Sequence, residues 1–177
     1  MGELRVAHTA DLDGATLQAI RHLMDVVFPG DFEEYDWEHA LGGMHALITE
    51  DGEPIAHASL VMRRLLHQGR ALRAGYVEAV GVHPDHRRRG HAGAVMGPLE
   101  RIIRTAYDIG ALGATDEATP MYTGRGWKPW QGETYALTPD GVIRTAAEDD
   151  AVFVLPAGAD LDLTATLTCD WRDGSVW

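Results

Sequence analysis

The feature that most constrains this chain is a strand-to-helix junction at residues 76–96, "YVEAVGVHPDHRRRGHAGAVM". An apolar run that contains one acid, Glu78, ends near a proline and continues into three arginines and a glycine. An amphipathic helical pattern follows. This order predicts one β-to-α crossover within a mixed α/β fold.

The same junction is positively charged in an acidic protein. The net charge of the 177 residues is −12, yet residues 61–104 hold nine arginines against three acids, which leaves +6. Residues 31–39 carry five acids and no Lys or Arg, and residues 131–177 carry nine acids and two arginines. Taken one at a time, most of these charged residues are explained as solvent-exposed surface charges. Their segregation predicts a local anion site in surroundings that attract a cation.

The positive junction has the form R-x-x-G-x-A at Arg87-Arg88-Arg89-Gly90-His91-Ala92. It lacks the glycines of a dinucleotide fingerprint and the lysine-hydroxyl pair of a P-loop. A helix N-terminus exposes unpaired N–H groups and the positive end of the helix dipole, which together receive phosphates. Gly90 and Ala92 would let the backbone approach that ligand closely. We therefore predict phosphate binding here.

Gly81, just before the arginines, predicts either a bulge or a close backbone approach. A bulge would free the N–H groups near Val80 and Val82 to hold an extended amide-bearing chain. The alternative is a plain strand with a convenient glycine.

Hydrophobic periodicity and turn signals predict an α+β order of elements in one domain, residues 1–177. Pro98 should kink the third helix or shift its start. Asp13 is the expected N-cap of the first helix, and Asp51-Gly52 the turn of the first hairpin. The expected helices are 13–28, 36–41, 90–107 and a short one near 119–124. The expected strands are 4–10, an early antiparallel hairpin over 44–66, then 70–82, 108–114, 125–137 and 150–156.

Composition excludes several classes of protein. No apolar run reaches 18 residues, so no membrane helix is expected, and the N-terminal sequence does not read as a secretory signal. A single cysteine, Cys169, suits a reducing cytosol and is expected to be a small buried side chain. The net charge argues against nucleic acid. His83 and His86 lack an evident third ligand, so no metal is expected.

These residues resemble the GCN5-related N-acetyltransferases (GNAT), whose acetyl-CoA pyrophosphate loop reads Q/R-x-x-G-x-G/A. Within that superfamily the chain is similar to the aminoglycoside 2′-N-acetyltransferases. The segments that carry this second resemblance are "GDFEEYDWEHALGGMHALI", "GYVEAVGV", "YTGRGWKPW", "VFVLP" and "CDWRDGSVW". It implies a mostly antiparallel twisted sheet flanked by helices, a splayed cofactor-binding strand, acetyl-CoA as cofactor and a cytoplasmic homodimer.

The resemblance also implies roles for individual residues. Glu78 would act through a water as general base or hold the acceptor amine, and Tyr122 would protonate the departing thiolate. The backbone of Val80 and Val82 would contact the acetyl carbonyl and pantetheine. The pyrophosphate would be held by Arg87, Arg88, Arg89, Gly90, His91 and Ala92. The acceptor site would be lined by Asp31, Asp36, Glu78, Glu148, Asp149 and the terminal carboxylate of Trp177.

General chemistry agrees with these roles, but alternatives stay open. An alkylammonium must lose a proton before it attacks a thioester, and carboxylates bind a polycation through charge-assisted hydrogen bonds. Glu78 could instead pair with Arg73, and Tyr122 could simply pack.

Three positions in the expected acceptor region depart from the branch pattern. Gly113, Glu148 and Ser175 stand where the branch has a serine and two aspartates, which leaves open gentamicin, tobramycin or kasugamycin. Another small amine, a peptide N-terminus, or a non-catalytic acetyl-CoA-binding domain are the other functions to test.

Overall fold

The computed structural model of the chain describes residues 2–177, which form two compact units. The N-terminal unit contains residues 2–61 and 77–101, and the C-terminal unit contains residues 62–76 and 102–177. Three elements pass from one unit into the other: β3 (Glu53–His67), β4 (Arg70–Val82) and α3 (His91–Ala106). The single domain expected over residues 1–177 stays a prediction.

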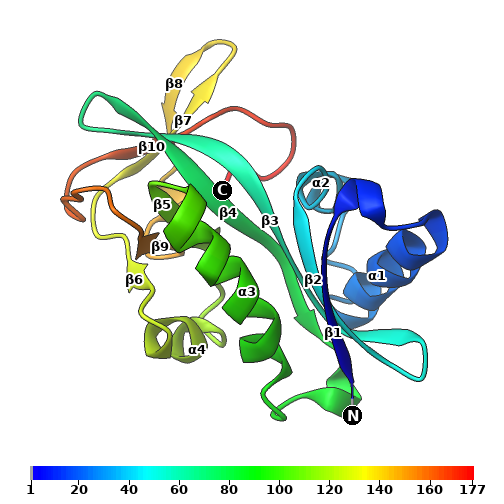
Figure 1. Ribbon diagram of the computed structural model, residues 1–177. Coiled ribbons are helices and arrows are strands. Elements are labelled where there is room, and N and C mark those ends of the chain that lie inside the picture. The colour runs from blue at the N-terminus through cyan, green and yellow to red at the C-terminus, as the bar shows by residue number, and fades with distance from the viewer. Residues whose placement is uncertain (1) are drawn as a thin grey trace. The chain divides into compact units, whose positions relative to one another are not determined.

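The N-terminal unit packs two helices against antiparallel strands. β2 pairs with both β1 and β3, all antiparallel, as the early-hairpin prediction required. A cluster of Ala7, Leu12, Ile20 and Leu47 joins the strands to α1, with Trp37 of α2 packed against it. Figure 1 shows α1 and α2 beside β1 and β2. The other elements of this unit are β1 (Glu3–His8), η1 (Thr9–Asp11), α1 (Gly14–Val27), α2 (Glu34–His39), β2 (Met44–Glu50) and η2 (Pro84–His86).

The helix starts follow from their caps. Asp13 is the N-cap of α1, and its carboxylate accepts the N–H of Thr16 at 2.8 Å, which confirms the prediction. α2 begins at Glu34, earlier than predicted, because Glu33 and Asp36 form a capping box. In that box the carboxylate of Asp36 accepts the N–H of Glu33 at 2.8 Å.

Two tight turns fix the long strands. Asp51 and Gly52 both have positive φ, 52° and 87°, as a type I′ hairpin turn requires. Gln68 and Gly69 do the same between β3 and β4, with φ of 48° and 76°. The predicted hairpin at Asp51-Gly52 and the predicted range of β4 are therefore both confirmed.

The C-terminal unit is mainly a sheet whose strands lie in the order β6-β9-β5-β4-β3-β10-β7-β8. Parallel pairing joins β4 to β5 and β7 to β10, and the other registered pairs are antiparallel. The sequence did not predict β8 or β10. The elements are β5 (Ile109–Gly113), α4 (Thr119–Gly124), β6 (Lys128–Pro129), β7 (Thr134–Thr138), β8 (Gly141–Arg144), η3 (Ala146–Glu148), β9 (Val152–Pro156) and β10 (Leu167–Cys169).

The predicted crossover is confirmed by the β4–β5 register, which pairs Ala74 with Ile109 and ends at Tyr76 and Ala111. The intervening helix α3 runs through Pro98, so the proline does not shift its start. Ile103 of α3 packs closely on β5, where a Cβ at Gly110 would stand 3.0 Å from it. The helical spacing of the sequence predicts one apolar face made of Val95, Leu99, Ile102, Ile103 and Ala106. Val95, Leu99 and Ile103 are fully buried, whereas Ala106 is exposed, so that part of the prediction was wrong.

These elements make an α+β fold with mostly antiparallel strand pairing, as the sequence predicted. Within residues 2–177, the helices are all too short or too polar to cross a membrane.

Candidate functional site

The predicted anion site lies in the N-terminal unit, where η2 leads into α3. Arg88 and Gly90 both adopt left-handed backbone angles, with φ of 58° and 84°. A Cβ at Gly90 would meet no atom within 4 Å, so its backbone angle, rather than lack of space, favours glycine. Gly90 is therefore needed for its left-handed backbone angle, and the open space around it leaves room for a ligand to approach the backbone.

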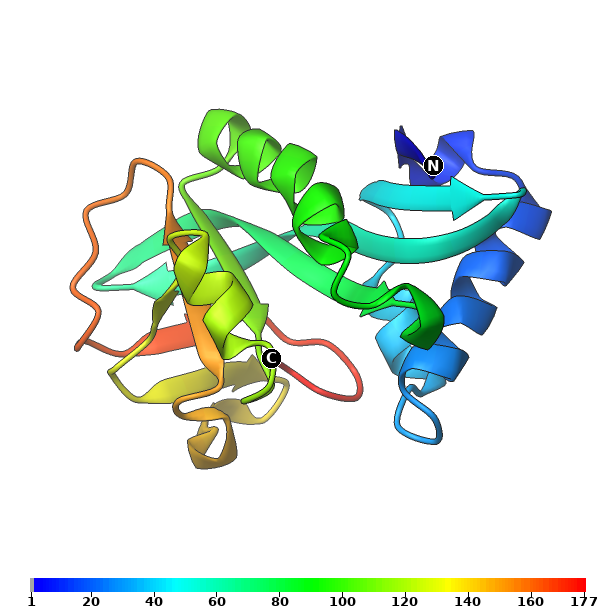
Figure 2. The same ribbon diagram turned by 90° about the horizontal axis from the view of Figure 1, so that it is seen from below.

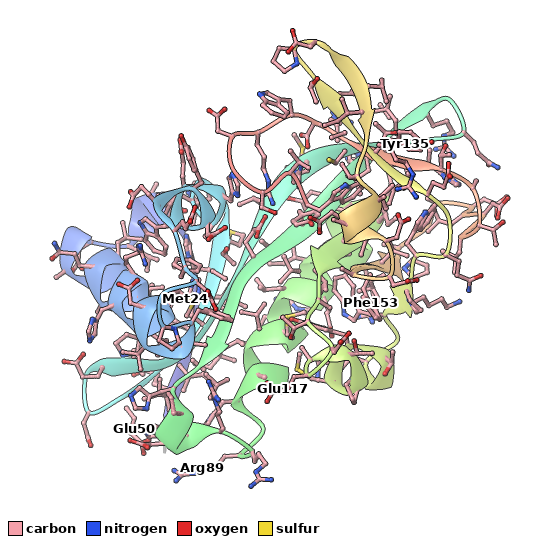
Figure 3. The ribbon with its side chains drawn as sticks, turned by 180° about the vertical axis from the view of Figure 1, so that it is seen from behind. Met24, Glu50, Arg89, Glu117, Tyr135 and Phe153 are labelled. Atoms are coloured by element: carbon pink, nitrogen blue, oxygen red, sulfur yellow. The ribbon has the colours of Figure 1, made fainter. Side chains whose placement is uncertain are left out.

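The first turn of α3 presents unpaired donors. The first helical hydrogen bond runs from the N–H of Ala94 to the carbonyl of Gly90 at 3.0 Å, so the amides of residues 91–93 precede the helical ladder. Arg87, Arg88 and Arg89 are exposed, and Figure 3 shows Arg89 pointing away from the ribbon. Free amides, the positive helix end and exposed guanidinium groups together fit a diphosphate.

Strand β4, which carries Glu78, Val80 and Val82, is distorted at Ala79. Ala79 has φ of 48°, a left-handed angle that is uncommon for a residue with a side chain. Its carbonyl accepts a hydrogen bond from Nδ1 of His57 at 2.9 Å. The distortion was expected at Gly81 and lies two residues earlier.

Gly81 has the second of the two roles predicted for it, a close approach of backbone. A Cβ there would stand 2.7 Å from Cε of Met24 and 3.2 Å from Val27, both on α1. Figure 3 labels Met24, on the side of α1 that faces β4. A side chain at Gly81 would therefore push α1 off the strand.

Glu78 is half-buried on β4, next to Ala79. Its carbonyl accepts the hydroxyl of Ser59 at 3.4 Å. Arg73, the alternative partner weighed for Glu78, binds Asp108 through its main-chain N–H at 2.8 Å and its guanidinium at 3.3 Å. A half-buried carboxylate at the edge of an apolar strand is suited to exchange a proton with a bound water.

Tyr122 lies on α4 in the C-terminal unit and is 4% exposed. Its ring meets the ring of Trp127 edge to face, with 6.1 Å between centroids. Burial raises the pKa of the Tyr122 hydroxyl to about 12, so it stays protonated at neutral pH. The Tyr122 ring packs against Trp127, as the packing alternative predicts. Its hydroxyl also keeps the proton that a general acid must donate.

Asp149 and Trp177 are brought together in the C-terminal unit by two threonines. The indole N–H of Trp177 donates to the hydroxyl of Thr145 at 2.9 Å, which donates to the hydroxyl of Thr134 at 2.8 Å. That hydroxyl lies 3.0 Å from the Asp149 carboxylate, which also forms a bidentate pair with Arg144. Hydrogen bonds, first of all from Arg144, lower the pKa of Asp149 to about 2. The Asp149 carboxylate is therefore already bound to Thr134 and Arg144 within the protein.

Arg63 clamps the tail that ends at Trp177. This arginine is 4% exposed, and its Nε donates to Oδ1 of Asp170 at 2.8 Å. Its Nη2 donates to the carbonyl of Val176 at 2.7 Å, and its guanidinium stacks 4.6 Å from the Tyr76 ring centroid.

The end of the chain lies beside β5 (Figure 2). Trp177 is 6% exposed, and its main-chain carbon lies 4.0 Å from where a Cβ at Gly113 would be. The hydroxyl of Ser175 donates to the Trp177 main-chain oxygen at 2.9 Å. Two of the three positions at which the sequence departs from the branch pattern thus touch this terminus.

The remaining predicted acceptor residues lie in different surroundings. Asp31 is exposed just after α1, and Asp36 is engaged in the α2 capping box; both belong to the N-terminal unit. Glu148 is half-buried at η3, in the C-terminal unit, where burial raises the pKa of its carboxyl.

Sequence reasoning missed several residues that build these surroundings. Thr134 and Arg144 belong to the β7–β8 hairpin, which Thr145 follows directly, and Pro139-Asp140-Gly141 was an unused signal for its turn. His45 and His57 are fully buried polar residues in apolar strands, and that pattern was their only signal.

The histidines and the cysteine that were weighed for other chemistry have local partners. His83 lies 3.9 Å from the Asp85 carboxylate, and Nδ1 of His86 lies 3.3 Å from that of Glu50. Among residues 2–177, His, Cys, Asp and Glu side chains form no group of three or more that could hold a metal ion. Cys169 is buried, as predicted, and burial raises the pKa of its thiol to about 11.

Comparison with known proteins agrees with this geometry. A family model described as "Acetyltransferase (GNAT) domain" matches residues 10–130. An aminoglycoside 2′-N-acetyltransferase from Mycolicibacterium fortuitum is 55% identical over 177 residues, which are 98% of this chain and 91% of that protein.

Solved structures share the fold. A GNAT family N-acetyltransferase (YhbS) from Escherichia coli in complex with CoA has a TM-score of 0.64 at 16% identity, covering 95% of this chain and 89% of that one. A GCN5-related N-acetyltransferase from Kribbella flavida has a TM-score of 0.59 at 23% identity, over 75% of this chain. The chain spans only 34% of that longer protein.

The chain belongs to the GNAT acetyltransferase family, in the branch that contains the Mycolicibacterium fortuitum relative. It is an acetyltransferase, and acetyl-CoA is its acetyl donor.

Proposed function

We propose that this enzyme transfers the acetyl group of acetyl-CoA to the 2′-amino group of an aminoglycoside antibiotic and so confers resistance to it. The observation that carries the proposal is the 55% identity to an aminoglycoside 2′-N-acetyltransferase, which extends over 98% of the chain and thus includes the tail. The acidic surface supports it as well, because a net charge of −12 favours the approach of a polycation.

The cofactor is held by the N-terminal unit in this proposal. Arg87, Arg88 and Arg89 neutralise the diphosphate, while Gly90, His91 and Ala92 present backbone amides to it. The distorted stretch of β4 offers the backbone groups of Val80 and Val82 to the acetyl carbonyl and the pantetheine amides. Acetyl-CoA supplies the acetyl group as an activated thioester.

Glu78 removes the proton that blocks attack. The substrate amine is protonated at neutral pH, and its nitrogen has no free electron pair until that proton leaves. The Glu78 carboxylate takes the proton through one bound water. A bond then forms from the nitrogen to the acetyl carbon, and the carbon–sulfur bond breaks.

Tyr122 delivers the proton that the leaving sulfur needs. Because burial keeps its hydroxyl protonated at neutral pH, the side chain acts as a donor and not as a base. As the amide forms, the nitrogen gives up its second proton, which restores the Tyr122 hydroxyl. The products are the N-acetylated amine and the neutral thiol of CoA, and the proton taken up by Glu78 passes to solvent.

The acceptor is recognised by carboxylates in this proposal. Asp31, Asp36, Glu148 and the carboxylate of Trp177 bind its ammonium groups. Asp149 is assigned to the same site, but its pairing with Arg144 and Thr134 supports an indirect contribution, through Thr145 to the Trp177 indole. Gly113 and Ser175, which lie beside Trp177, differ from the branch pattern and would help to select the antibiotic: gentamicin, tobramycin or kasugamycin.

The test is release of CoA thiol from acetyl-CoA across a panel of amines. The panel contains tobramycin, gentamicin, kasugamycin, the 2′-hydroxyl compound kanamycin A, and a peptide with a free N-terminus. We expect turnover with one or more of the first three and none with kanamycin A at the 2′ position, checked by mass and NMR of the product. Turnover of the peptide alone, or CoA binding without turnover of any amine, would reject the proposal.

We further propose that the enzyme works as a homodimer in the cytoplasm. The support is the branch resemblance and one cysteine with a buried, un-ionised thiol, which suits a reducing compartment. Light scattering on the eluting protein measures the oligomeric state, and a monomeric mass at micromolar concentration would contradict it.

A further inference from the structure

Two buried histidines of the N-terminal unit form a row of hydrogen bonds that ends at Ala79 on β4, the strand that carries Glu78. The hydroxyl of Thr9 lies 2.7 Å from Nε2 of His45, and Nδ1 of His45 lies 2.9 Å from Nε2 of His57. Nδ1 of His57 lies 2.9 Å from the carbonyl of Ala79. Both imidazoles are fully buried, and none of the proposed catalytic or binding roles uses them.

The chemistry of the last contact fixes the direction of the whole row. A carbonyl only accepts, so Nδ1 of His57 must carry its proton. Burial lowers the pKa of His57 to about 3 and that of His45 to about 4, so both rings are neutral at working pH. Nε2 of His57 is then an acceptor and Nδ1 of His45 its donor. Nε2 of His45 accepts in turn from the Thr9 hydroxyl.

The far end of the row is anchored to the backbone. The Thr9 hydroxyl oxygen accepts the N–H of Gly42 at 2.9 Å. Its single proton has two acceptors within reach, Nε2 of His45 at 2.7 Å and the carbonyl of Gly43 at 3.2 Å, and the direction of the row assigns it to His45. Every imidazole nitrogen in the row therefore has one partner of the correct kind. A fully satisfied buried network of this sort is rigid, because reversing any member would face two acceptors against each other.

The row ends at the residue whose backbone is strained. Ala79 has φ of 48°, and a left-handed alanine persists only where its surroundings hold it. Ala79 stands between Glu78 and Val80, so its torsion sets the direction of the Glu78 side chain and of the Val80 N–H. The hydroxyl of Ser59 holds the adjacent carbonyl of Glu78 at 3.4 Å.

We propose that His57, backed by His45, is a positioning residue that locks β4 in its left-handed turn at Ala79 and so orients Glu78 and Val80 for acetyl transfer. The proposal rests on the roles assigned above to Glu78 and Val80. The row transfers no proton to the substrate, since the Ala79 carbonyl cannot take one up.

A matched pair of substitutions separates the two contacts of His57. In His57→Asn the side-chain amide replaces Nδ1 and can still donate to the Ala79 carbonyl. In His57→Gln it replaces Nε2 and can only face His45. We expect His57→Gln to lower kcat/KM for acetyl transfer to tobramycin about 10²-fold, the cost of a misplaced catalytic group. His57→Asn should keep most of the activity.

His67 supplies the control for simple loss of a buried imidazole. It is 3% exposed in the C-terminal unit, and its two nitrogens meet the Thr166 carbonyl at 3.3 Å and the Asp162 N–H at 3.2 Å. His67→Gln should lower the unfolding midpoint without a comparable loss in kcat/KM of the folded enzyme. Equal losses in His57→Asn and His57→Gln, or the same loss in His67→Gln, would overturn the proposal.

A second measurement needs no acceptor and therefore stands if the proposed antibiotic is wrong. Nitrogen-15 NMR of histidine-labelled protein should show His45 and His57 neutral and protonated at Nδ1 between pH 6 and about 8. CoA titrations should give weaker binding for His57→Gln than for His57→Asn, since Val80 contacts the cofactor. A His57 protonated at Nε2, or equal CoA affinity in the two variants, would reject the positioning role.

Discussion

The β4–α3 junction is built from residues close in sequence, whereas the C-terminal tail is held by residues far away along the chain. At the junction, Arg87 donates to the carbonyl of Val82, five positions back, and Ala94 to that of Gly90. In the tail, Arg63 binds Asp170 and Val176 across 107 and 113 positions. The proposed cofactor site is thus a local motif, and the proposed acceptor site is a product of tertiary structure.

Removing Arg63 should give the largest effect. Arg63→Ala leaves the carbonyls of Asp170 and Val176 without their donor and breaks the ion pair between the buried guanidinium and the Asp170 carboxylate, which is 38% exposed, so we expect a loss of about 3 kcal/mol in unfolding free energy. The KM of the amine should rise while that of acetyl-CoA stays constant, because only the tail is released. Urea denaturation and steady-state kinetics measure both. Arg64→Ala, at the exposed neighbour, should change stability by less than about 0.5 kcal/mol.

The two regions should also lose stability in different pH ranges. Burial lowers the pKa of His45 and His57 from 6.5 to about 4 and about 3. The unfolded chain therefore binds more protons below pH 6.5, and stability falls as the pH drops from there toward 3. The pKa of Asp149 is about 2 in the folded protein, against 3.8 for an ordinary aspartate. This carboxylate therefore contributes stability above pH 3.8 that is lost as the pH falls through about 2.

Urea midpoints between pH 7 and 2.5 separate these two ranges. Asp149→Asn should flatten the curve only below about pH 4, whereas His57→Asn should flatten it from about pH 6.5 down to about 3. A change in slope above pH 5 in Asp149→Asn would contradict the assignment.

Gly90→Ala should have a smaller effect, of about 1 kcal/mol, because alanine is strained at a φ of 84°. The Gly90 amide also belongs to the anion site, so we expect a higher KM for acetyl-CoA and an unchanged KM for the amine. Gly124→Ala is the control, since that glycine also has open space but no positive φ. Equal effects of the two substitutions on the acetyl-CoA KM would show that the left-handed angle is unimportant.

The smallest change in stability is expected for Gly113→Ser. A Cβ there lies 4.0 Å from the main-chain carbon of Trp177, an ordinary contact, so stability should move by less than about 0.5 kcal/mol. The added hydroxyl restores the branch residue beside the proposed acceptor site and should shift kcat/KM between tobramycin and kasugamycin. An unchanged ratio would remove Gly113 from the specificity determinants.

The same contrast explains what the sequence could predict. Asp13 caps α1, Asp51-Gly52 turns the hairpin, and the range of β4 is as expected, because caps, turns and alternation are local. β10 was missed because Leu167–Cys169 is too short to carry a pattern, and its pairing with β3 and β7 supplies its stability.

Within the candidate site, motif residues could be named but their surroundings could not. Arg87–Ala92 follow from the R-x-x-G-x-A pattern together with its place after a strand. By contrast, the Thr145–Thr134–Asp149 row depends on which strands meet, and the Ala79 distortion depends on His57, 22 positions away. The distortion was predicted at Gly81 because glycine is a known sequence signal for a bulge, whereas no sequence pattern indicates a left-handed alanine such as Ala79.

The long sequence separation of the Arg63–Asp170 contact has a consequence for how the molecule forms. Contacts across 107 positions require closure of a long loop, whose entropy must be offset before the contact gains anything. We therefore expect the hairpins around β3 and β4 to form early during refolding and the tail to dock last. Pulse-labelled hydrogen exchange tests this order: protection at Leu167–Cys169 that precedes protection of β2 and β3 would reverse it.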